Sequence, residues 1–164
     1  IQFKFLKNTT RGQSETVLAG LSKDDFDIPL LIFNIDTRFS SSTLEGALIK
    51  NKDTGYLGSF KELTPHFSFA RTDKNGFVIE VAEKVAISNN ALTGLYHFAK
   101  TKHFFEAATD AIQENETQKG EFYVAPLYNR LIKKGLKFKL DICNECDVIG
   151  TPNELERFKK KIFQ

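Results

Sequence analysis

Two aspartates stand where an α/β protein often places groups that bind ligands. Asp36 directly follows the apolar run at residues 29–35 (PLLIFNI), and Asp147 lies shortly before Gly150. Ligands of open α/β sheets bind at the carboxyl ends of strands, and carboxylate oxygens suit a hard divalent cation such as Mg²⁺. The simpler alternative for each residue is a turn aspartate, with Asp36 capping the turn into Thr37.

The third candidate is the pair Glu83-Lys84, which ends a strand-like segment. A glutamate accepts hydrogen bonds from sugar hydroxyls, and a lysine supplies a mobile positive charge for a phosphate. An exposed ion pair is the commoner use of this dipeptide, so the pair alone does not define a site.

Alternating strand-like and helix-like segments must position these residues, and their order predicts an α/β architecture. The continuous apolar run at residues 29–35 is typical of a strand buried on both faces, deep in a parallel sheet. Asn75-Gly76 predicts the tight turn of a hairpin. Further strands are predicted at residues 1–6, 55–60, 67–72, 77–81, 91–98 and 136–142.

Capping signals predict where the helices begin and end. Ser42-Thr43-Leu44-Glu45 has the capping-box pattern and predicts a helix to about Lys50. Thr151, followed by a proline and an early acid, predicts the start of the last helix. Three other helices are predicted at residues 15–21, 103–112 and 124–134.

The composition is that of one ordinary soluble domain, with 164 residues, 41% hydrophobic and 27% charged. The net charge is only +2, and the basic run at residues 159–161 lies on a helix whose inner face is Leu155, Phe158 and Ile162. We interpret that run as solvated surface, with no nucleic-acid partner. No stretch approaches the roughly 18 to 20 apolar residues of a membrane span, and a signal-peptide layout is missing, so we expect a cytoplasmic protein without a membrane partner.

The two cysteines form one Cys-x-x-Cys, Cys143 and Cys146. Zinc would need two more ligands, and the three histidines show no paired spacing. We interpret the cysteines as free thiols, with a metal or redox role as the alternative.

Four segments together resemble the nucleotidyltransferase family that makes nucleoside-diphosphate sugars. The segment 10–17 (TRGQSETV) resembles the family's glycine turn near the nucleobase, and PLLIFNIDT resembles its strand ending in a metal-binding aspartate. The stretch from residue 67 through VIEVAEKVAISNNALTGLYHF resembles its hairpin, glutamate-lysine pair and following strand. GEFYVAPLYNRLIKKG and DVIGTPNELERF resemble a helix and the closing aspartate-x-glycine-threonine-proline turn. Each piece is common by itself, so the resemblance depends on their order.

The resemblance implies a role for each matching residue. Asp36 and Asp147 would ligate Mg²⁺, Glu83 would bind sugar hydroxyls, and Lys84 would contact the sugar phosphate, with Lys84 and Asp36 as the catalytic residues. Thr93 and Gly94 would border the sugar ring. Gly12 and Gln13 would approach the base.

Three features depart from the family's pattern. Val85 replaces the usual proline after the glutamate-lysine pair, and cysteines replace an aromatic residue before the closing aspartate. The family's first strand and its glycine-rich, basic triphosphate loop have no counterpart here, and the chain opens on Ile1 without a methionine. We therefore expect a single partial nucleotidyltransferase domain, residues 1–164, which alone does not turn over.

The expected fold is α/β, Rossmann-like, with a mixed, mostly parallel central sheet flanked by helices. The expected activity is Mg²⁺-dependent formation of a nucleoside-diphosphate sugar and pyrophosphate from a nucleoside triphosphate and a sugar 1-phosphate, in surface polysaccharide or nucleotide-sugar biosynthesis. Two alternatives stay open: a non-catalytic sugar- or nucleotide-binding regulatory domain of this fold, and a metal-dependent glycosyltransferase. The sequence leaves base, sugar and homo-oligomer formation open.

Overall fold

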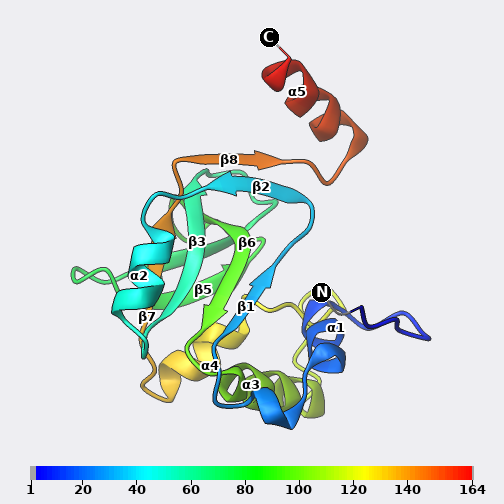
Figure 1. Cartoon of the computed structure of the whole chain (residues 1–164), viewed down its shortest axis with the longest axis vertical. Helices are drawn as coiled ribbons and strands as arrows, with labels where there is room; N and C mark the ends of the chain where they lie inside the picture. The colour runs from blue at the N-terminus through cyan, green and yellow to red at the C-terminus, as the bar shows by residue number, and fades with distance from the viewer. Residues whose placement is uncertain (1–2, 164) are drawn as a thin grey trace.

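The computed structural model (Figure 1) describes residues 3–163, which form runs of strands separated by helices. The strands are β1 (Leu30–Phe33), β2 (Thr37–Ser40), β3 (Gly55–Lys61), β4 (Ser68–Thr72), β5 (Val78–Glu83), β6 (Asn90–Phe98), β7 (Phe138–Ile142) and β8 (Glu145–Val148). The helices are α1 (Gln13–Gly20), α2 (Leu44–Lys50), α3 (Thr101–Gln113), α4 (Leu127–Lys133) and α5 (Pro152–Ile162), with a 3₁₀ turn at Lys23–Asp25.

The main sheet has six strands in the order β5-β4-β6-β3-β7, and β1 pairs with the second half of β6. The long strand β6 lies at the centre because it pairs antiparallel with β1, β3 and β4. All of its residues except Asn90 are buried. Among the described strands, only β3 and β7 pair in parallel.

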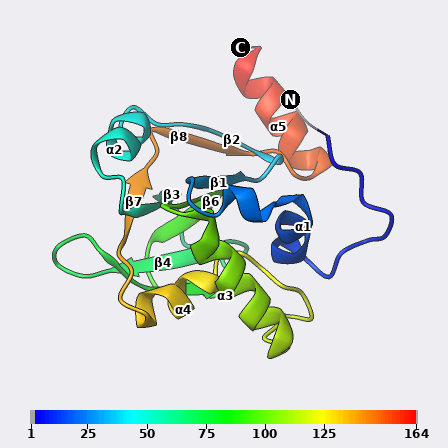
Figure 2. The ribbon, with the colours of Figure 1, turned by 60° about the horizontal axis from the view of Figure 1, so that its bottom comes forward.

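Helices α3 and α4 cover one face of this sheet, while α2 and the β2–β8 ribbon lie on the other side (Figure 2). The core lies under α3 and α4, where an aromatic cluster joins helices to strands. Tyr128 of α4 stacks on Phe98 of β6 with ring centroids 4.7 Å apart, and it meets Phe138 of β7 edge-on at the same distance. Rings in these arrangements add about 0.5–1.5 kcal/mol per pair beyond the burial of their area.

The sequence did not predict the two-stranded ribbon of β2 and β8. It pairs Thr37 with Val148 and Arg38 with Asp147, antiparallel. These strands are four residues long and carry no continuous apolar run, so their pairing left no periodic signal.

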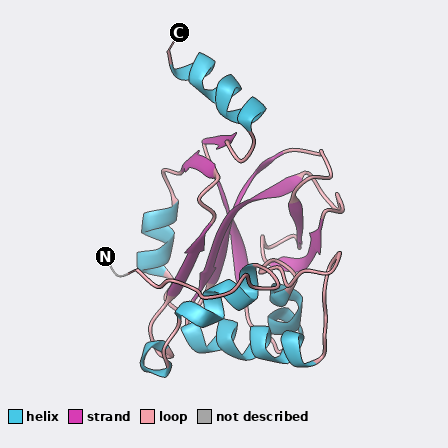
Figure 3. Cartoon of the chain, turned by 90° about the vertical axis from the view of Figure 1, so that its right-hand side faces the viewer, coloured by secondary structure: helices cyan, strands magenta, loops and turns pink. Residues whose placement is uncertain are grey.

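Helix α5 extends the ribbon and stands apart from the rest of the molecule (Figure 3). It begins as predicted, with a full capping box between Thr151 and Glu154 and with Pro152 at its start. It has no buried residue, and Leu155 and Ile162 are 38% and 51% exposed. The predicted inner face therefore has no core to cover in the described part of the chain.

The predicted mixed α/β sheet flanked by helices is confirmed, but its mostly parallel character is wrong. A single parallel pairing stands beside several antiparallel ones in the described sheet. Continuous apolar runs report that both faces of a strand are covered and say nothing of the direction of its neighbours.

The prediction of a deep strand at residues 29–35 is also wrong in its burial. Within residues 3–163, strand β1 pairs with β6 alone, and its side chains alternate, so that Leu31 and Phe33 are 52% and 47% exposed. Of the strand predicted at residues 1–6, the first two residues lie outside the described part, and residues 3–6 form no strand.

Helix α2 begins at Leu44 as predicted, but Ser42 does not cap it. The hydroxyl of Ser41 accepts hydrogen bonds from the backbone N–H groups of Thr43 and Leu44, at 3.2 and 3.0 Å. The Thr43 hydroxyl instead donates to Asp141 Oδ1 at 2.6 Å and ties α2 to β7. Helix α4 is shorter than predicted and begins after Pro126.

Among the described residues, no helix is both long enough and apolar enough to cross a membrane.

Glycine-to-alanine substitution should change the stability of the protein in opposite directions at one position in the sheet and one in a helix. A Cβ on Gly55 of β3 would meet the Phe138 ring at 2.4 Å and the His97 carbonyl oxygen at 2.7 Å, whereas a Cβ on Gly46 of α2 meets nothing within 4 Å. We expect Gly55→Ala to lower the free energy of unfolding by about 1–3 kcal/mol. Gly46→Ala should raise it by up to about 1 kcal/mol through helix propensity. Urea denaturation measures both, and equal effects would contradict the packing around Gly55.

Candidate functional site

A single open cavity of about 730 Å³ collects most of the residues singled out in the sequence. It lies between the β2–β8 ribbon with α5 on one side and the start of β4, the end of β5 and the middle of β6 on another. The predicted residues that line it are Gln13, Asp36, Glu83, Lys84, Thr93, Gly94 and Asp147.

Asp36 lies against the turn that leads into α5. Its backbone carbonyl accepts a hydrogen bond from Ile149 N–H at 2.9 Å, and a Cβ on Gly150 would come within 3.0 Å of Asp36 Oδ2. The ribbon therefore holds the start of β2 and the end of β8 together, and the small residue at position 150 leaves space for the carboxylate.

Asp147 lines the same cavity, but two cations already contact its carboxylate. Lys161 Nζ lies 2.6 Å from Oδ1, and Arg38 Nη1 lies 2.9 Å from Oδ2. The hydrogen bond from Lys161, followed by the one from Arg38, holds the pKa of Asp147 below its usual range. The group is therefore ionised near neutral pH, as a metal ligand must be.

Both carboxylates line the same cavity, and Mg²⁺ binds side chains of this kind. Mg²⁺ is usually held by one or two carboxylates together with phosphate oxygens and water. No group of three or more histidine, cysteine or acidic side chains could hold a metal in the described chain, so substrate would have to complete the coordination.

Glu83 lies at the floor of the cavity in a small polar network. Ser68 Oγ donates to Glu83 Oε2, and the pKa of Tyr96 beside them is raised because the phenol is buried. Burial also raises the pKa of Glu83, although the Ser68 hydrogen bond opposes this. A carboxylate held in this way keeps a second oxygen for a ligand hydroxyl.

Lys84 points to Tyr123, which the sequence did not single out. Lys84 Nζ donates to the Tyr123 hydroxyl at 2.8 Å and lies 4.8 Å from the centroid of its ring. This hydrogen bond raises the pKa of Lys84, so the ammonium stays charged. Lys84 also has a left-handed backbone with φ of 55°, which costs a non-glycine residue about 1–3 kcal/mol.

Thr93 and Gly94 have structural neighbours as well as a place in the cavity lining. Thr93 is buried, and its Oγ1 lies over Gly58, where a Cβ would come within 2.4 Å of it. Gly94 has φ of 86°, and a Cβ there would come within 2.6 Å of the Asn34 amide. Gly94 therefore makes room for Asn34, itself a lining residue that the prediction missed.

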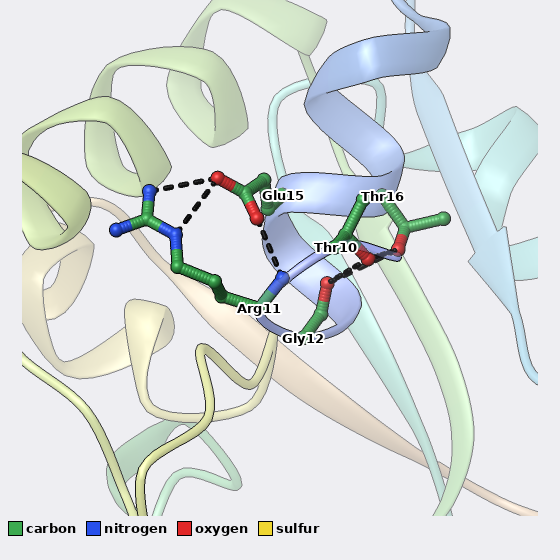
Figure 4. A network of polar contacts seen from close by, with 5 residues as sticks. All are labelled: Thr10, Arg11, Gly12, Glu15 and Thr16. Atoms are coloured by element: carbon green, nitrogen blue, oxygen red, sulfur yellow. Dashed lines mark hydrogen bonds and ion pairs between the residues drawn. The ribbon is translucent and has the colours of Figure 1, made fainter. Parts of the chain in front are cut away.

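Of the two residues predicted to approach the base, Gln13 lines the cavity and Gly12 does not. Gln13 lines the cavity and donates to Asn34 Oδ1 at 3.4 Å. Gly12 is not among the described lining residues, because its φ of 141° brings it against the backbone of Phe122, with a Cβ only 2.6 Å from Phe122 N. A local network around this turn (Figure 4) includes the ion pair of Arg11 with Glu15 at 2.7 Å.

The cysteines are both free, and Cys146 lines the cavity beside Asp147. Burial raises the pKa of Cys143 and raises that of Cys146 to about 12. Both thiols are therefore protonated at neutral pH, which makes them poor nucleophiles.

The sequence also missed the residues that α5 brings to the cavity. Lys161 was assigned to a solvated run, yet it pairs with Asp147. Arg157 and Phe158 line the cavity, and Arg38 lies 5.8 Å from the ring of Phe158. The helical spacing of these residues was visible, but only the unpredicted β2–β8 pairing turns this face toward the site.

Comparison with solved structures finds a relative with clear sequence similarity. The nucleoside-diphosphate-sugar pyrophosphorylase from Vibrio cholerae RC9 is 35% identical, with a TM-score of 0.79 over 94% of this chain and 67% of that chain. No protein-family model matches the sequence, and no curated protein matches it.

Two further structures share the fold at lower identity. A putative glucose-1-phosphate thymidylyltransferase from Bacillus anthracis, in complex with a sucrose, is 18% identical, with a TM-score of 0.73 over 94% of this chain. A UDP-glucose pyrophosphorylase complexed with UDP-glucose is 13% identical, with a TM-score of 0.78 over 96%. The chain spans 62% and 64% of these two proteins, so the match covers somewhat under two thirds of each.

Glu83→Gln should affect stability in a pH-dependent way. Because burial raises the folded-state pKa above the ordinary 4.5, ionised Glu83 weakens folding progressively as pH rises from the unfolded pKa through the folded one. The glutamine keeps an oxygen for the Ser68 hydroxyl and carries no charge. We expect the free energy of unfolding of the variant, relative to that of the parent, to increase as pH rises through this window. Urea titrations between about pH 4 and 7 measure this gain, and a difference that is constant with pH would contradict it.

Proposed function

The chain belongs to the family of nucleoside-diphosphate-sugar pyrophosphorylases, and on this premise we propose that it forms part of a sugar-1-phosphate nucleotidyltransferase. The proposed reaction joins a nucleoside triphosphate to a sugar 1-phosphate in the presence of Mg²⁺ and releases pyrophosphate. Its place would be in nucleotide-sugar biosynthesis.

The observation that supports this proposal is the meeting of Asp36, Glu83 and Lys84 in one cavity. Asp36 lies between β1 and β2, and Glu83 and Lys84 lie at the end of β5. In one cavity they would supply a carboxylate for a metal, an acceptor for hydroxyls and a cation for phosphate. That combination suits two phosphorylated substrates, one of which is a sugar.

Glu83 and Lys84 would bind the sugar 1-phosphate. Glu83, held by Ser68, would accept hydrogen bonds from sugar hydroxyls, and Lys84 would leave or share the Tyr123 hydroxyl to contact the phosphate. A phosphate oxygen of this substrate is ionised at neutral pH, so its attack on the α-phosphorus needs no general base. The main tasks of the protein are then to align two anions and to offset their repulsion.

Asp36 would be the principal ligand of Mg²⁺, and Asp147 the second. Mg²⁺, when bound, supplies charge neutralisation and orients the phosphates. Two residues, Val148 and Ile149, separate Asp147 from Gly150, one more than in the aspartate-x-glycine turn that the sequence resembles. Together with the ion pairs of Asp147, this spacing favours Asp36 as the stronger ligand.

A product assay tests the reaction class. The full-length protein that contains this chain is incubated with Mg²⁺, each nucleoside triphosphate and a set of sugar 1-phosphates, and nucleotide sugar and pyrophosphate are measured by chromatography. We expect both products in equal amounts, and we expect Lys84→Ala to reduce their rate about tenfold or more, since a charged hydrogen bond contributes about 1.5–3 kcal/mol. Transfer of sugar from a nucleotide sugar to an acceptor would favour a glycosyltransferase, and binding without turnover would favour a non-catalytic domain.

Calorimetry tests the metal assignment separately. Nucleotide affinity is measured with and without Mg²⁺ for the parent chain, for Asp36→Asn and for the matched control Asp53→Asn, an exposed turn aspartate outside the cavity. We expect the parent and the control to bind nucleotide more tightly with Mg²⁺, and Asp36→Asn to lose this dependence. An unchanged Mg²⁺ effect in Asp36→Asn would exclude Asp36 as the ligand.

A further inference from the structure

One face of α5 forms a wall of the cavity. Its residues Glu154, Arg157, Phe158 and Lys161 follow the i, i+3, i+4, i+7 spacing of a single helical stripe, and all four line the cavity. The helix buries no side chain in a core, so this stripe is a surface turned toward the site.

The orientation of this stripe is fixed by contacts with the ribbon. Lys161 pairs with Asp147 of β8, and Arg38 of β2 lies over the ring of Phe158. Both contacts come from the strands that hold the predicted metal ligands. Arg157 is four residues before Lys161 and therefore lies one helical turn from it, on the same side.

Arg157 differs from the other four arginines of the chain. Arg11, Arg38, Arg71 and Arg130 each pair with a carboxylate, whereas Arg157 makes no ion pair with any described residue. A guanidinium presents a planar set of donors that matches phosphate oxygens in pairs. A cavity arginine without a protein carboxylate is free to bind such an anion.

The second cation that lines the cavity without an ion pair is Lys84, whose hydrogen-bond partner is the neutral Tyr123 hydroxyl. Lys84 adjoins Glu83, which suits a phosphate attached to a sugar. Arg157 instead lies one helical turn from Lys161, which contacts the ribbon carboxylate Asp147, and Mg²⁺ held by carboxylates also binds substrate phosphates. The two cations thus serve two different anions.

We propose that Arg157, at the centre of the cavity-facing stripe of α5, binds the phosphate groups of the nucleoside triphosphate, an inference that rests on the proposed function. Lys161 assists it when phosphates or a metal ion replace its contact with Asp147. Helix α5 then acts as a substrate-binding element of the site.

Binding of inorganic pyrophosphate in the presence of Mg²⁺ tests this inference without turnover. Calorimetry compares the parent with Arg157→Ala and with the matched control Lys160→Ala, which removes the same charge from α5 at a residue outside the cavity lining. We expect Arg157→Ala to weaken pyrophosphate binding about tenfold or more, and Lys160→Ala to change it less than about threefold. Arg157→Lys should retain part of the affinity, because lysine keeps the positive charge but lacks the planar set of donors of the guanidinium.

Sugar 1-phosphate binding, measured on the same variants, separates this inference from the proposed function. We expect Arg157→Ala to leave it unchanged and Lys84→Ala to weaken it. Equal loss of pyrophosphate binding in Arg157→Ala and Lys160→Ala, or no loss in either, would overturn the role of Arg157. Failure of the parent to bind pyrophosphate would also overturn it, whereas failure of the parent to bind sugar 1-phosphate would count against the proposed function instead. Circular dichroism of each variant checks that α5 stays helical.

Discussion

The antiparallel pairing of β2 with β8 is the contact on which the site depends. It joins the strand that follows β1 to the strand that follows β7, and so places Asp36 beside Gly150 and Arg38 beside Asp147. Without it, neither carboxylate would have a fixed relation to the other, and α5 would have no place above the cavity. Four residues on each side make the ribbon short, so side-chain contacts across it carry much of its stability.

The residues of the site could be predicted from the sequence wherever chemistry and local pattern coincided. Asp36 and Glu83-Lys84 follow strands, and the order of the segments indicated the family, so most of these residues share one cavity. Tyr123 could not be found in this way, because its contact with Lys84 depends on how residues far apart in the sequence pack. Gly12 shows the converse, since its place in a glycine turn was visible from the sequence but its neighbour, Phe122, was not.

The positions of most helices and strands could be predicted from the sequence, whereas the pairing between strands could be predicted less well. Turn and capping signals located the hairpin at Asn75-Gly76 and the start of α5 because these signals are local. The apolar run before Asp36 predicts a central strand, yet the central strand is β6, and β1 is half-exposed. Apolar composition measures what a strand is able to bury, while tertiary pairing decides what it does bury.

The absence of buried residues from α5 has a thermodynamic consequence. A helix that contributes no apolar area to the core is held by its cap and by a few polar contacts such as Lys161 with Asp147, and not by the cooperative unit around Tyr128. Segments of this kind open with a small fraction of the global free energy of unfolding, and their amide protons exchange through that local opening. Any ligand bridging α5 and the ribbon would add its binding energy to this local equilibrium. Occupancy of the site is thereby coupled to the folding of a single helix, and slowed amide exchange in α5 would report it.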